Sequence, residues 1–306
     1  MDGTGNNDFW RNRGYFAVEI NSLFKLSFSM VVFIRRYIIQ FLTLVVAGVW
    51  LAIFQLPDSN LHIVACDVGQ GDAILILKGS VQILTDGGPN KKVLDCLSEY
   101  IPFWDREIEL VVSTHPDADH STGLIDVVKR YNVGTFLAND LDVSTQVWQA
   151  LKKEVGSAGV RVLHPTNGLK LRLGLIYLDI LHPPEGFESA KTNEYSIVYV
   201  LKYGDFEGIF TGDINQMISD QLSVNSEIGT VDYIKVPHHG SKNGLTENLL
   251  KVLKPKIAVI SVGKNSYGHP HEEILQMLKN SNAKLLRTDL KGDVRIATDG
   301  KEYWIY

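Results

Sequence analysis

The chain has 306 residues, enough for one large domain or two small ones, and an ordinary globular composition. Lysine and arginine number 30 against 35 acidic residues, a formal charge of −5 that argues against a broad basic face for nucleic acid. A polyanionic substrate would therefore be held by metal ions or by a local basic cluster. Cys66 and Cys96 could form one disulfide outside the cytoplasm, but we expect two packed thiols instead.

An apolar stretch near the N-terminus, residues 37–56, reads YIIQFLTLVVAGVWLAIFQL and has no charged residue. Its length suits the roughly 30 Å hydrocarbon core of a bilayer. We therefore predict a transmembrane helix at 37–56, in preference to a buried core helix or a cleaved signal peptide. The preceding run Leu23–Ile34 is interrupted by Lys25 and followed by Arg35 and Arg36. We interpret this run as an interfacial amphipathic segment.

The charges that flank the apolar stretch predict its orientation. The next cation after it is Lys78, whereas five precede it, namely Arg11, Arg13, Lys25, Arg35 and Arg36. Under the positive-inside rule, residues 1–36 form a cytoplasmic or interfacial segment and the chain after Pro57 lies outside the cytoplasm. The sequence thus predicts a single-pass protein of the cell membrane. A second crossing by Leu23–Ile34 would reverse this orientation.

Beyond the span, short β-rich segments alternate with helical ones. The expected strands, of which the first three suit an antiparallel meander, are Leu61–Asp67, Asp72–Leu77, Val81–Asp86, Glu109–His115, Gly134–Leu137, Val160–His164, Ile176–His182, Ser196–Tyr203, Gly208–Thr211, Asp232–Val236, Ala258–Val262 and Asp293–Ala297. The expected helices are Lys91–Tyr100, Ser121–Tyr131, Ser144–Val155, Asn215–Leu222, Thr246–Leu253 and His271–Lys279. This mixture predicts one α/β domain over residues 61–306, with sheets covered by helices.

The densest polar cluster directly follows an apolar strand. It reads His115-Pro116-Asp117-Ala118-Asp119-His120, four candidate ligands in six positions, on a loop expected between strand and helix. Imidazole and carboxylate groups suit zinc, manganese or iron. One such residue alone could be a turn former or a helix cap, as Asp119 could be for the next helix. Four together predict a metal site.

Two further strand ends carry the same residue types. Asp213 follows a strand within Thr211-Gly212-Asp213, and the segment KVPHHGS (Lys235–Ser241) brings His238 and His239 to the end of another strand. Ligand sites in α/β sheets gather at the carboxyl ends of the strands. We therefore expect the three ligand-bearing loops to converge.

These motifs resemble those of the metallo-β-lactamase superfamily, which opens with HxHxDH and continues with a bridging aspartate and a late histidine. More closely, the sequence resembles the extracellular metallo-β-lactamase-like domain of ComEC-type competence proteins. The segments that carry this resemblance, in the family's order, are DVGQGDA (Asp67–Ala73), TDGG (Thr85–Gly88), HPDADH (His115–His120), LHP (Leu181–Pro183), TGD (Thr211–Asp213), KVPHHGS (Lys235–Ser241) and SVGKNSYGHPH (Ser261–His271). The implied fold is a four-layer αβ/βα sandwich with the site at one edge.

The resemblance also implies two divalent metal ions, manganese or zinc with magnesium as a further candidate. Asp213 would bridge the two ions, with His115 and Asp117 on the first and Asp119 and His120 on the second. The last ligand of the second ion would be His238, or alternatively His239.

Two departures from the superfamily pattern affect the first metal site. Asp117 stands where the superfamily has its second histidine, as in the ComEC-like branch. A further histidine would fall near Asn193–Ser196, where this chain has none. The first site is therefore expected to be rich in oxygen and short of a ligand, so that it binds metal more weakly.

Other polar residues near these loops are expected to act on the substrate. Asp119 would also orient the nucleophile, and His269 or His271 would donate a proton to the leaving oxygen. Substrate contacts are expected from Gln70, Asp72, Lys235, Asn265 and Tyr267, although lysines on such loops are equally often solvated surface.

The function implied by the resemblance is a membrane-anchored, metal-dependent nuclease or phosphodiesterase that cleaves DNA, preferably single-stranded, outside the cytoplasm. ComEC proteins also carry a channel domain of several helices, whereas one span is expected here, so channel or uptake proteins are candidate partners. Two alternatives stay open. One is a phosphodiesterase for cell-wall or phosphorylcholine-type substrates, and the other is a non-catalytic DNA-binding module of an uptake complex.

Overall fold

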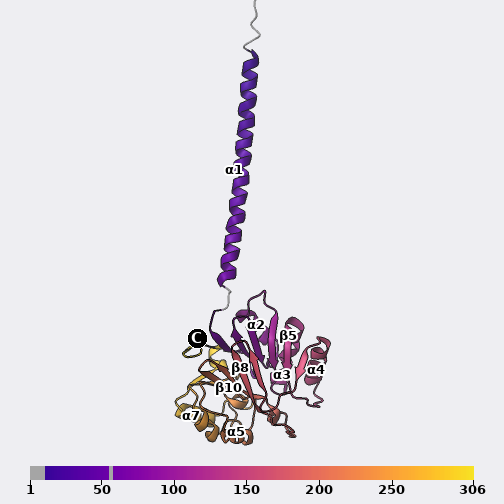
Figure 1. Cartoon of the computed structure of the whole chain (residues 1–306), viewed down its shortest axis with the longest axis vertical. Helices are drawn as coiled ribbons and strands as arrows, with labels where there is room; N and C mark the ends of the chain where they lie inside the picture. The colour runs from indigo at the N-terminus through magenta and orange to yellow at the C-terminus, as the bar shows by residue number, and fades with distance from the viewer. Residues whose placement is uncertain (1–10, 55–57) are drawn as a thin grey trace, which may run out of the picture. The chain divides into compact units, whose positions relative to one another are not determined.

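The structure, a computed structural model, describes residues 11–54 and 58–306. The chain divides into two compact units, Met1–Leu56 and Pro57–Tyr306 (Figure 1). In the first unit, helix α1 (Arg11–Phe54) runs without interruption for 44 residues. Its segment Met30–Leu51 is long and apolar enough to cross a membrane, which confirms the prediction of one such N-terminal helix.

The interfacial position of Leu23–Ile34 stays a prediction. Helix α1 continues through this run and through Arg35 and Arg36. Arginine is a good helix former, so this pair does not end the helix. The candidate span accordingly begins at Met30 rather than Tyr37. Positions 55 and 56 of the predicted span lie outside the described residues.

Two sheets form the second unit. The larger has eight strands in the order β15–β14–β1–β2–β3–β4–β5–β6, and the smaller has seven in the order β13–β12–β11–β10–β9–β8–β7. The strands are β1 (Leu61–Ala65), β2 (Ile74–Lys78), β3 (Val81–Thr85), β4 (Glu107–Val112), β5 (Asn132–Leu137), β6 (Arg161–Leu163), β7 (Lys170–Leu173), β8 (Ile176–His182), β9 (Val198–Tyr203), β10 (Phe206–Phe210), β11 (Tyr233–Lys235), β12 (Ile257–Ile260), β13 (Lys284–Arg287), β14 (Val294–Thr298) and β15 (Tyr303–Ile305). As predicted, β1, β2 and β3 are antiparallel neighbours.

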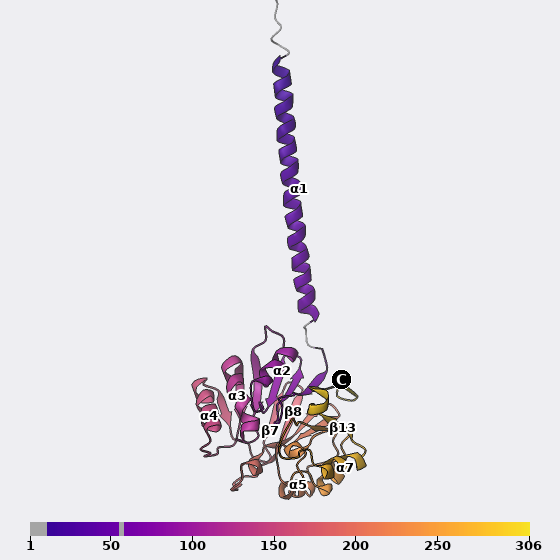
Figure 2. The ribbon, with the colours of Figure 1, turned by 180° about the vertical axis from the view of Figure 1, so that it is seen from behind.

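Helices cover the outer face of each sheet. They are α2 (Lys92–Tyr100), α3 (Ala118–Arg130), α4 (Gln146–Ser157), α5 (Gln216–Ser223), α6 (Glu247–Leu253), α7 (Glu272–Asn280) and the short α8 (Thr288–Lys291), with 3-10 turns η1 (Thr192–Tyr195) and η2 (Pro237–Gly240). Figures 1 and 2 show α2, α3 and α4 on one side of the sheets and α5 and α7 on the other.

Side-chain alternation along the strands explains these layers. Leu61 and Ile63 of β1 pack between the two sheets, whereas Val64 points to the helices over the larger sheet. A third apolar cluster joins the smaller sheet to α5, α6 and α7. Three apolar layers therefore separate four layers of secondary structure, and the predicted αβ/βα sandwich is confirmed.

Three strands were not predicted from the sequence: β7, β13 and β15. Each has only three or four residues, too few to establish a period of two. In β7, which pairs with β8 at the edge of its sheet, Lys170 and Arg172 alternate with half-buried leucines. Hydrogen bonding to an existing strand therefore determines these segments more than their own composition does.

Cys66 and Cys96 form a disulfide, so the expectation of two packed thiols is wrong. Cys66 directly follows β1, Cys96 lies on α2, and both are buried in the apolar layer between the larger sheet and its helices. The fold brings their Cα atoms to 5.9 Å, within the range that a disulfide requires. Thirty residues separate the two in sequence, and nothing local signals this approach.

Candidate metal centre

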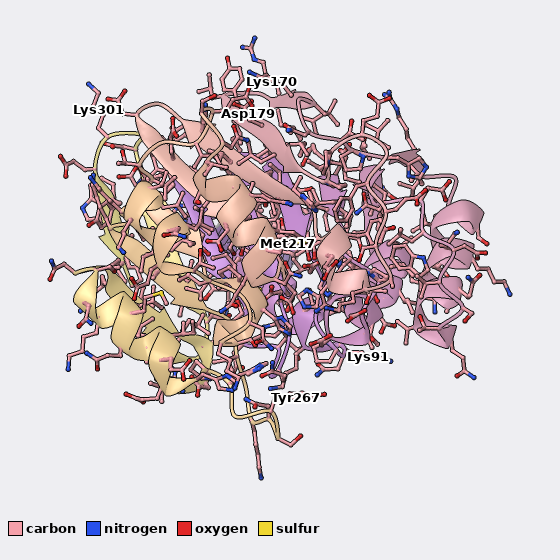
Figure 3. All side chains as sticks on the ribbon, turned by 90° about the horizontal axis from the view of Figure 1, so that it is seen from below. Lys91, Lys170, Asp179, Met217, Tyr267 and Lys301 are labelled. Carbon is pink, nitrogen blue, oxygen red and sulfur yellow. A yellow bond between two sulfur atoms is a disulfide. The ribbon has the colours of Figure 1, made fainter. Side chains whose placement is uncertain are left out.

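Four loops meet where strands of both sheets end. Asp86 directly follows β3, and His115 comes shortly after the parallel strand β4. In the second sheet, Asp213 and His239 come shortly after the parallel strands β10 and β11. Because parallel neighbours end at the same edge, these side chains converge there as predicted. Figure 3 shows Tyr267, from another loop of this region, at the end of the domain opposite to Lys301.

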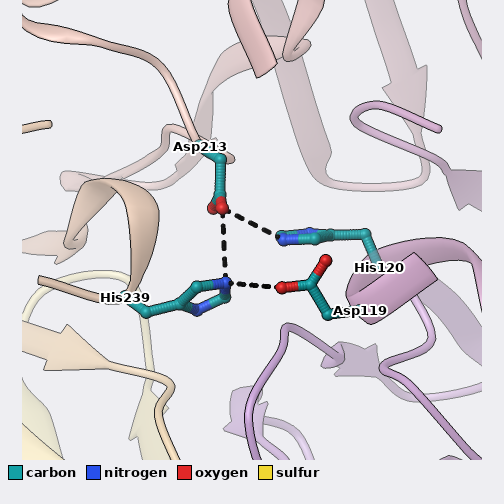
Figure 4. Close-up of side chains that lie close together, drawn as sticks. All are labelled: Asp119, His120, Asp213 and His239. Atoms are coloured by element: carbon teal, nitrogen blue, oxygen red, sulfur yellow. Dashed lines mark ion pairs between the residues drawn. The ribbon is translucent and has the colours of Figure 1, made fainter. Parts of the chain in front are cut away.

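Asp119, His120, Asp213 and His239 offer ligand atoms that all lie within 4.8 Å of one another, and we call these four residues the cage (Figure 4). Oδ2 of Asp213 lies 3.3 Å from Nε2 of His120 and 3.3 Å from Nε2 of His239. The same Nε2 of His239 lies 3.4 Å from Oδ2 of Asp119. Donors from the first turn of α3 and from the segments after β10 and β11 therefore surround one small volume.

The hydrogen bonds of the imidazoles show that the cage fits a metal ion. Each ring uses Nδ1 for a protein contact: His120 to Asp86 Oδ2 at 2.8 Å, His239 to the Ser261 carbonyl oxygen at 2.8 Å, and His115 to the Thr114 hydroxyl at 3.0 Å. In each ring the buried Nε2 has no hydrogen-bond partner among the described residues. With the proton on Nδ1, each Nε2 presents a lone pair, which is the form that ligates metal.

Asp117 and His115 form a second group of possible ligands, with fewer donor residues than the cage. Nε2 of His115 lies 3.9 Å from Oδ2 of Asp117, whose Oδ1 accepts a hydrogen bond of 2.6 Å from Thr192. At the position of the missing histidine, Ser196 Oγ accepts the backbone N–H of Asp213 at 2.9 Å. Within the described part of the chain, no group of three or more possible ligands includes His115.

Burial and charge shift the pKa values of the cage in opposite directions. Burial alone would lower the pKa of His120 and His239, but Asp213, with Asp86 at His120 and Asp72 at His239, raises both well above the ordinary value. Burial would raise the pKa of Asp213, but the two imidazoles hold it well below its ordinary value. Without metal, the carboxylates thus keep protons on the two imidazoles of the cage, and a bound metal cation would displace those protons.

The cluster HPDADH does not lie on a loop throughout, as the sequence had suggested. Helix α3 begins at Ala118, so Asp119 and His120 belong to its first turn. The residue at the helix N-cap is Asp117, with an extended backbone, and not Asp119. The helix fixes the directions of Asp119 and His120, which reach the cage, while Asp117 stays outside it with His115.

His238 and His239 are separated by the structure. The side chain of His238 is 29% exposed and its Nε2 lies 3.9 Å from Asp213 Oδ2, whereas the side chain of His239 is 2% exposed and lies at 3.3 Å. The ring of His238 instead packs edge-on against His269, with centroids 5.6 Å apart. The geometry therefore puts His239 in the cage and leaves His238 at its rim.

Two of the expected substrate-binding residues are not available to a substrate. The side chains of Lys235 and Asp72 are 1% and 2% exposed and form a direct ion pair with each other. This burial argues against direct contacts of the pair with a substrate. Lys235 ends a strand and points into the domain, which its position near a ligand loop did not reveal.

The expected substrate-binding residues in and beside the loop after β12 differ in how available they are to a substrate. Asn265 is committed to shaping the loop, because its amide donates to the carbonyl oxygens of Gly263 and His269 and its Oδ1 accepts from the N–H groups of Tyr267 and His269. Gln70 likewise accepts from the N–H of Gly263 through Oε1. Tyr267 is 68% exposed and remains available for substrate.

His269 and His271, the two expected proton donors, lie next to each other with ring centroids 5.1 Å apart. Burial, together with the neighbouring imidazoles, lowers the pKa of His269 to about 4. His269 is therefore neutral at pH 7 in the protein alone.

Several residues that support the ligands were not predicted from the sequence. They are Asp86 and Ser261 behind the imidazoles of the cage, Thr114 behind His115, and Thr192 behind Asp117. Asp86 could have been suspected, since it ends a strand within TDGG. The others have common side chains or use a backbone carbonyl, so the sequence carries no signal for them.

A two-sheet sandwich gathers imidazoles and carboxylates at one edge, and with the family match to residues 66–264 this makes the chain a metal-dependent hydrolase. The chain belongs to the metallo-β-lactamase superfamily, whose family model matches residues 66–264. The matched segment contains every residue of the cage.

Relatives support a more specific kinship. The chain is 28% identical over 264 residues to ComE operon protein 3 of Bacillus subtilis (strain 168), covering 80% of this chain and 34% of that protein. It is 25% identical over 249 residues to Competence protein ComA of Neisseria gonorrhoeae, covering 77% and 32%. The predicted kinship with competence proteins is confirmed, and the chain spans about a third of the length of these relatives.

Among solved structures, the metallo-β-lactamase fold protein YhfI from Bacillus subtilis superposes with a TM-score of 0.54 at 12% identity. The match covers 81% of this chain and all of YhfI. At this identity the likeness shows the fold alone.

Proposed function

We propose that the chain is a membrane-anchored, metal-dependent phosphodiesterase that cleaves DNA, preferably single-stranded, outside the cytoplasm. The observation that carries this proposal is the cage of unpartnered Nε2 atoms and carboxylates in a chain related to competence proteins. The family supplies the hydrolytic chemistry. The names of the relatives indicate a role in the uptake of DNA, which makes a phosphodiester the favoured substrate.

Charge in the centre favours two divalent ions over one. With the imidazoles neutral, as metal binding requires, five carboxylates against one ammonium leave a net charge of −4, from Asp72, Asp86, Asp117, Asp119, Asp213 and Lys235. Two divalent ions would balance that charge. The cage would hold one ion, and His115 with Asp117 would hold the other more weakly. Oxygen-rich donors favour manganese or magnesium at the site of His115 and Asp117, with zinc suited to the cage.

Residues of this chain would orient water, donate a proton and contact the substrate around these ions. Divalent ions supply Lewis acidity, which lowers the pKa of water and offsets phosphate charge. Asp119 is 36% exposed at the mouth of the cage, so it can orient the attacking water. His271 would donate a proton to the leaving oxygen, as would His269 once an anionic phosphate raises its pKa. Tyr267 is placed to contact the substrate.

Location outside the cytoplasm has two supports. Five cations precede the apolar stretch and none follows it before Lys78, which orients the chain by the positive-inside rule. The disulfide between Cys66 and Cys96 is typical of an oxidising compartment. Membrane channel or uptake proteins are the proposed partners, because the chain is related to competence proteins and spans about a third of their length.

Cleavage of DNA by purified full chain in detergent tests the proposal. Labelled single- and double-stranded DNA and a bis-phosphodiester would be incubated with manganese, zinc or magnesium. We expect metal-dependent cleavage that falls at least about 100-fold in Asp213→Ala and Asp119→Ala, since each removes a proposed ligand. The matched control is Asp95→Asn, which changes an exposed carboxylate on α2.

Each other outcome has a distinct meaning. Unchanged cleavage in both cage variants would mean a contaminating nuclease or a wrong site. Turnover of the bis-phosphodiester but not of DNA would favour cell-wall or phosphorylcholine-type substrates. Binding of DNA without turnover, at full manganese occupancy, would identify a binding module.

A further inference from the structure

Lys235 lies where a charge is costly. It ends β11, and within residues 58–306 it is the only buried lysine or arginine, with 1% of its side chain exposed. An unpaired buried ammonium destabilises a fold strongly. Even a well-paired one is often no better for stability than an apolar residue of the same size. Packing therefore does not explain why the centre contains this lysine.

The contacts of the ammonium group indicate what it does. Its Nζ contacts Oδ2 of Asp72, lies 3.7 Å from Oδ1 of Asp213, and donates to the carbonyl oxygen of Gly212 at 3.3 Å. Gly212 directly precedes Asp213 in the chain. Lys235 therefore contacts both the backbone and the side chain of the segment that delivers a proposed ligand.

The two oxygens of Asp213 face different partners as a result. Oδ1 faces Lys235, while Oδ2 lies 3.3 Å from Nε2 of His120 and 3.3 Å from Nε2 of His239. The ammonium thus stands behind the carboxylate and turns its other oxygen into the cage.

Asp72 extends the same connection to the remaining cage residues. Its backbone N–H donates to the carbonyl oxygen of Asp119 at 3.3 Å, and its Oδ1 lies 3.5 Å from Nδ1 of His239. The ion pair of Lys235 with Asp72 therefore joins the first turn of α3, which carries Asp119, to the segments that carry Asp213 and His239.

We infer that Lys235 is a positioning residue, an internal cation that holds Asp213 and Asp72 so that the cage is assembled before metal binds. The inference rests on the proposed metal centre but not on DNA as the substrate. A bound metal ion would fix the carboxylate of Asp213 directly, in place of the protonated imidazoles that face it without metal. Lys235 is therefore needed most when the metal is absent.

Melting of the full chain in detergent, with EDTA or with saturating Mn²⁺, tests this dependence. Lys235→Met keeps the volume and removes the charge. We expect its melting temperature to fall by roughly 10 °C in EDTA and by less than about half of that with Mn²⁺. The control Lys202→Met breaks the ion pair of Lys202 with Asp179, 3.1 Å long and 39% exposed at the lysine, and should change both values equally and little.

The double variant Lys235→Met with Asp72→Asn separates position from charge. It removes one positive and one negative charge, so the net charge of the centre stays the same. We expect it to regain much of its metal-free melting temperature, yet to bind Mn²⁺ at least about tenfold more weakly in competition with a chelator, because Asp213 is no longer held. If Lys235→Met alone does not fold, the double variant still tests the inference.

Three results would overturn the inference. An equal loss of melting temperature by Lys235→Met with and without Mn²⁺ would assign Lys235 to ordinary core packing, and so would failure of both variants to fold. The third is wild-type affinity for Mn²⁺ in the double variant. Neither readout involves DNA, so a chain that binds metal as described but cleaves no DNA would leave the inference standing.

Discussion

His238 and His239 are neighbours in sequence that have separate environments. Both adopt left-handed backbone, with φ of 52°, which is uncommon for residues other than glycine. Such strain is retained where surrounding structure enforces it, often at functional sites. Here it sends one imidazole into the cage and leaves the other at the rim beside His269.

Replacing each histidine by alanine separates their roles. We expect His239→Ala to weaken metal binding at least about 100-fold, because a buried ligand is lost, and His238→Ala to change it by less than about threefold. Competition with a chromophoric chelator, with metal content measured by mass spectrometry, gives both values. Loss of metal from the His238 variant alone would reverse the assignment.

The raised pKa values of His120 and His239 predict opposite pH trends for the metal-free and metal-loaded protein. A raised folded-state pKa gives stability that is complete below the unfolded value of about 6.5 and is lost as pH rises through the folded value. Metal must bind the deprotonated rings, so its affinity increases with pH.

Between about pH 6.5 and 8.5 we therefore expect the melting temperature to fall in EDTA and to hold or rise with saturating Mn²⁺. Calorimetry in buffers of different ionisation enthalpy should also show protons released on metal binding. Parallel pH trends in the two samples would show that the imidazoles do not carry protons in the metal-free cage.

At the scale of elements, backbone hydrogen bonds connect α3 to the loop after β3. The N–H of Gly87 donates to the carbonyl oxygen of His120 at 2.7 Å, and the N–H of Gly123 donates to that of Gly88 at 3.0 Å. A Cβ at Gly123 would lie 1.9 Å from the carbonyl oxygen of Gly87. Glycine therefore permits the approach that brings His120 beside Asp86.

Gly123→Ala should accordingly destabilise the domain by about 3 kcal/mol and weaken metal binding, because α3 must move away from the sheet. The matched control is Gly156→Ala on α4, where a Cβ meets nothing within 4 Å. That change should stabilise by about 0.5–1 kcal/mol through helix propensity. Urea unfolding measures both, and a Gly123 variant as stable as wild type would refute the close approach.

At the scale of the molecule, the chain consists of two compact units, one with an exposed apolar helix and the other with a buried apolar core. The apolar side chains of Met30–Leu51 on α1 are exposed, as suits a helix in lipid. The second unit buries three apolar clusters of its own and contains the cage and its supporting residues.

Deletion of residues 1–57 should thus give a soluble fragment that melts within a few degrees of the full chain and binds the same amount of metal. The full chain should instead partition with membranes or detergent. Sedimentation, thermal melting and metal analysis test this expectation. A fragment that aggregates or loses its metal would show that the two units depend on each other.

The residue patterns by themselves predicted an α/β domain with helix-covered sheets, the apolar helix and most of the residues that form the cage, and the family resemblance added the two-sheet sandwich. Alternating apolar residues and ligand-bearing strand ends are local patterns, and topology then brings parallel strand ends to one edge. The strands β7, β13 and β15 were not predicted, because each is too short for its residues to show a period of two. β7 and β15 pair with the strands next to them in the chain, whereas β13 pairs with β12 from across a helix.

The tertiary structure alone decided what depends on side-chain direction and distant approach. It joined Cys66 to Cys96, chose His239 over His238 for the cage, and buried Lys235 against Asp72. Residue type and spacing are the same whether a side chain points to solvent or into a core. Only the packed layers fix that direction, and with it the chemistry that each residue can perform.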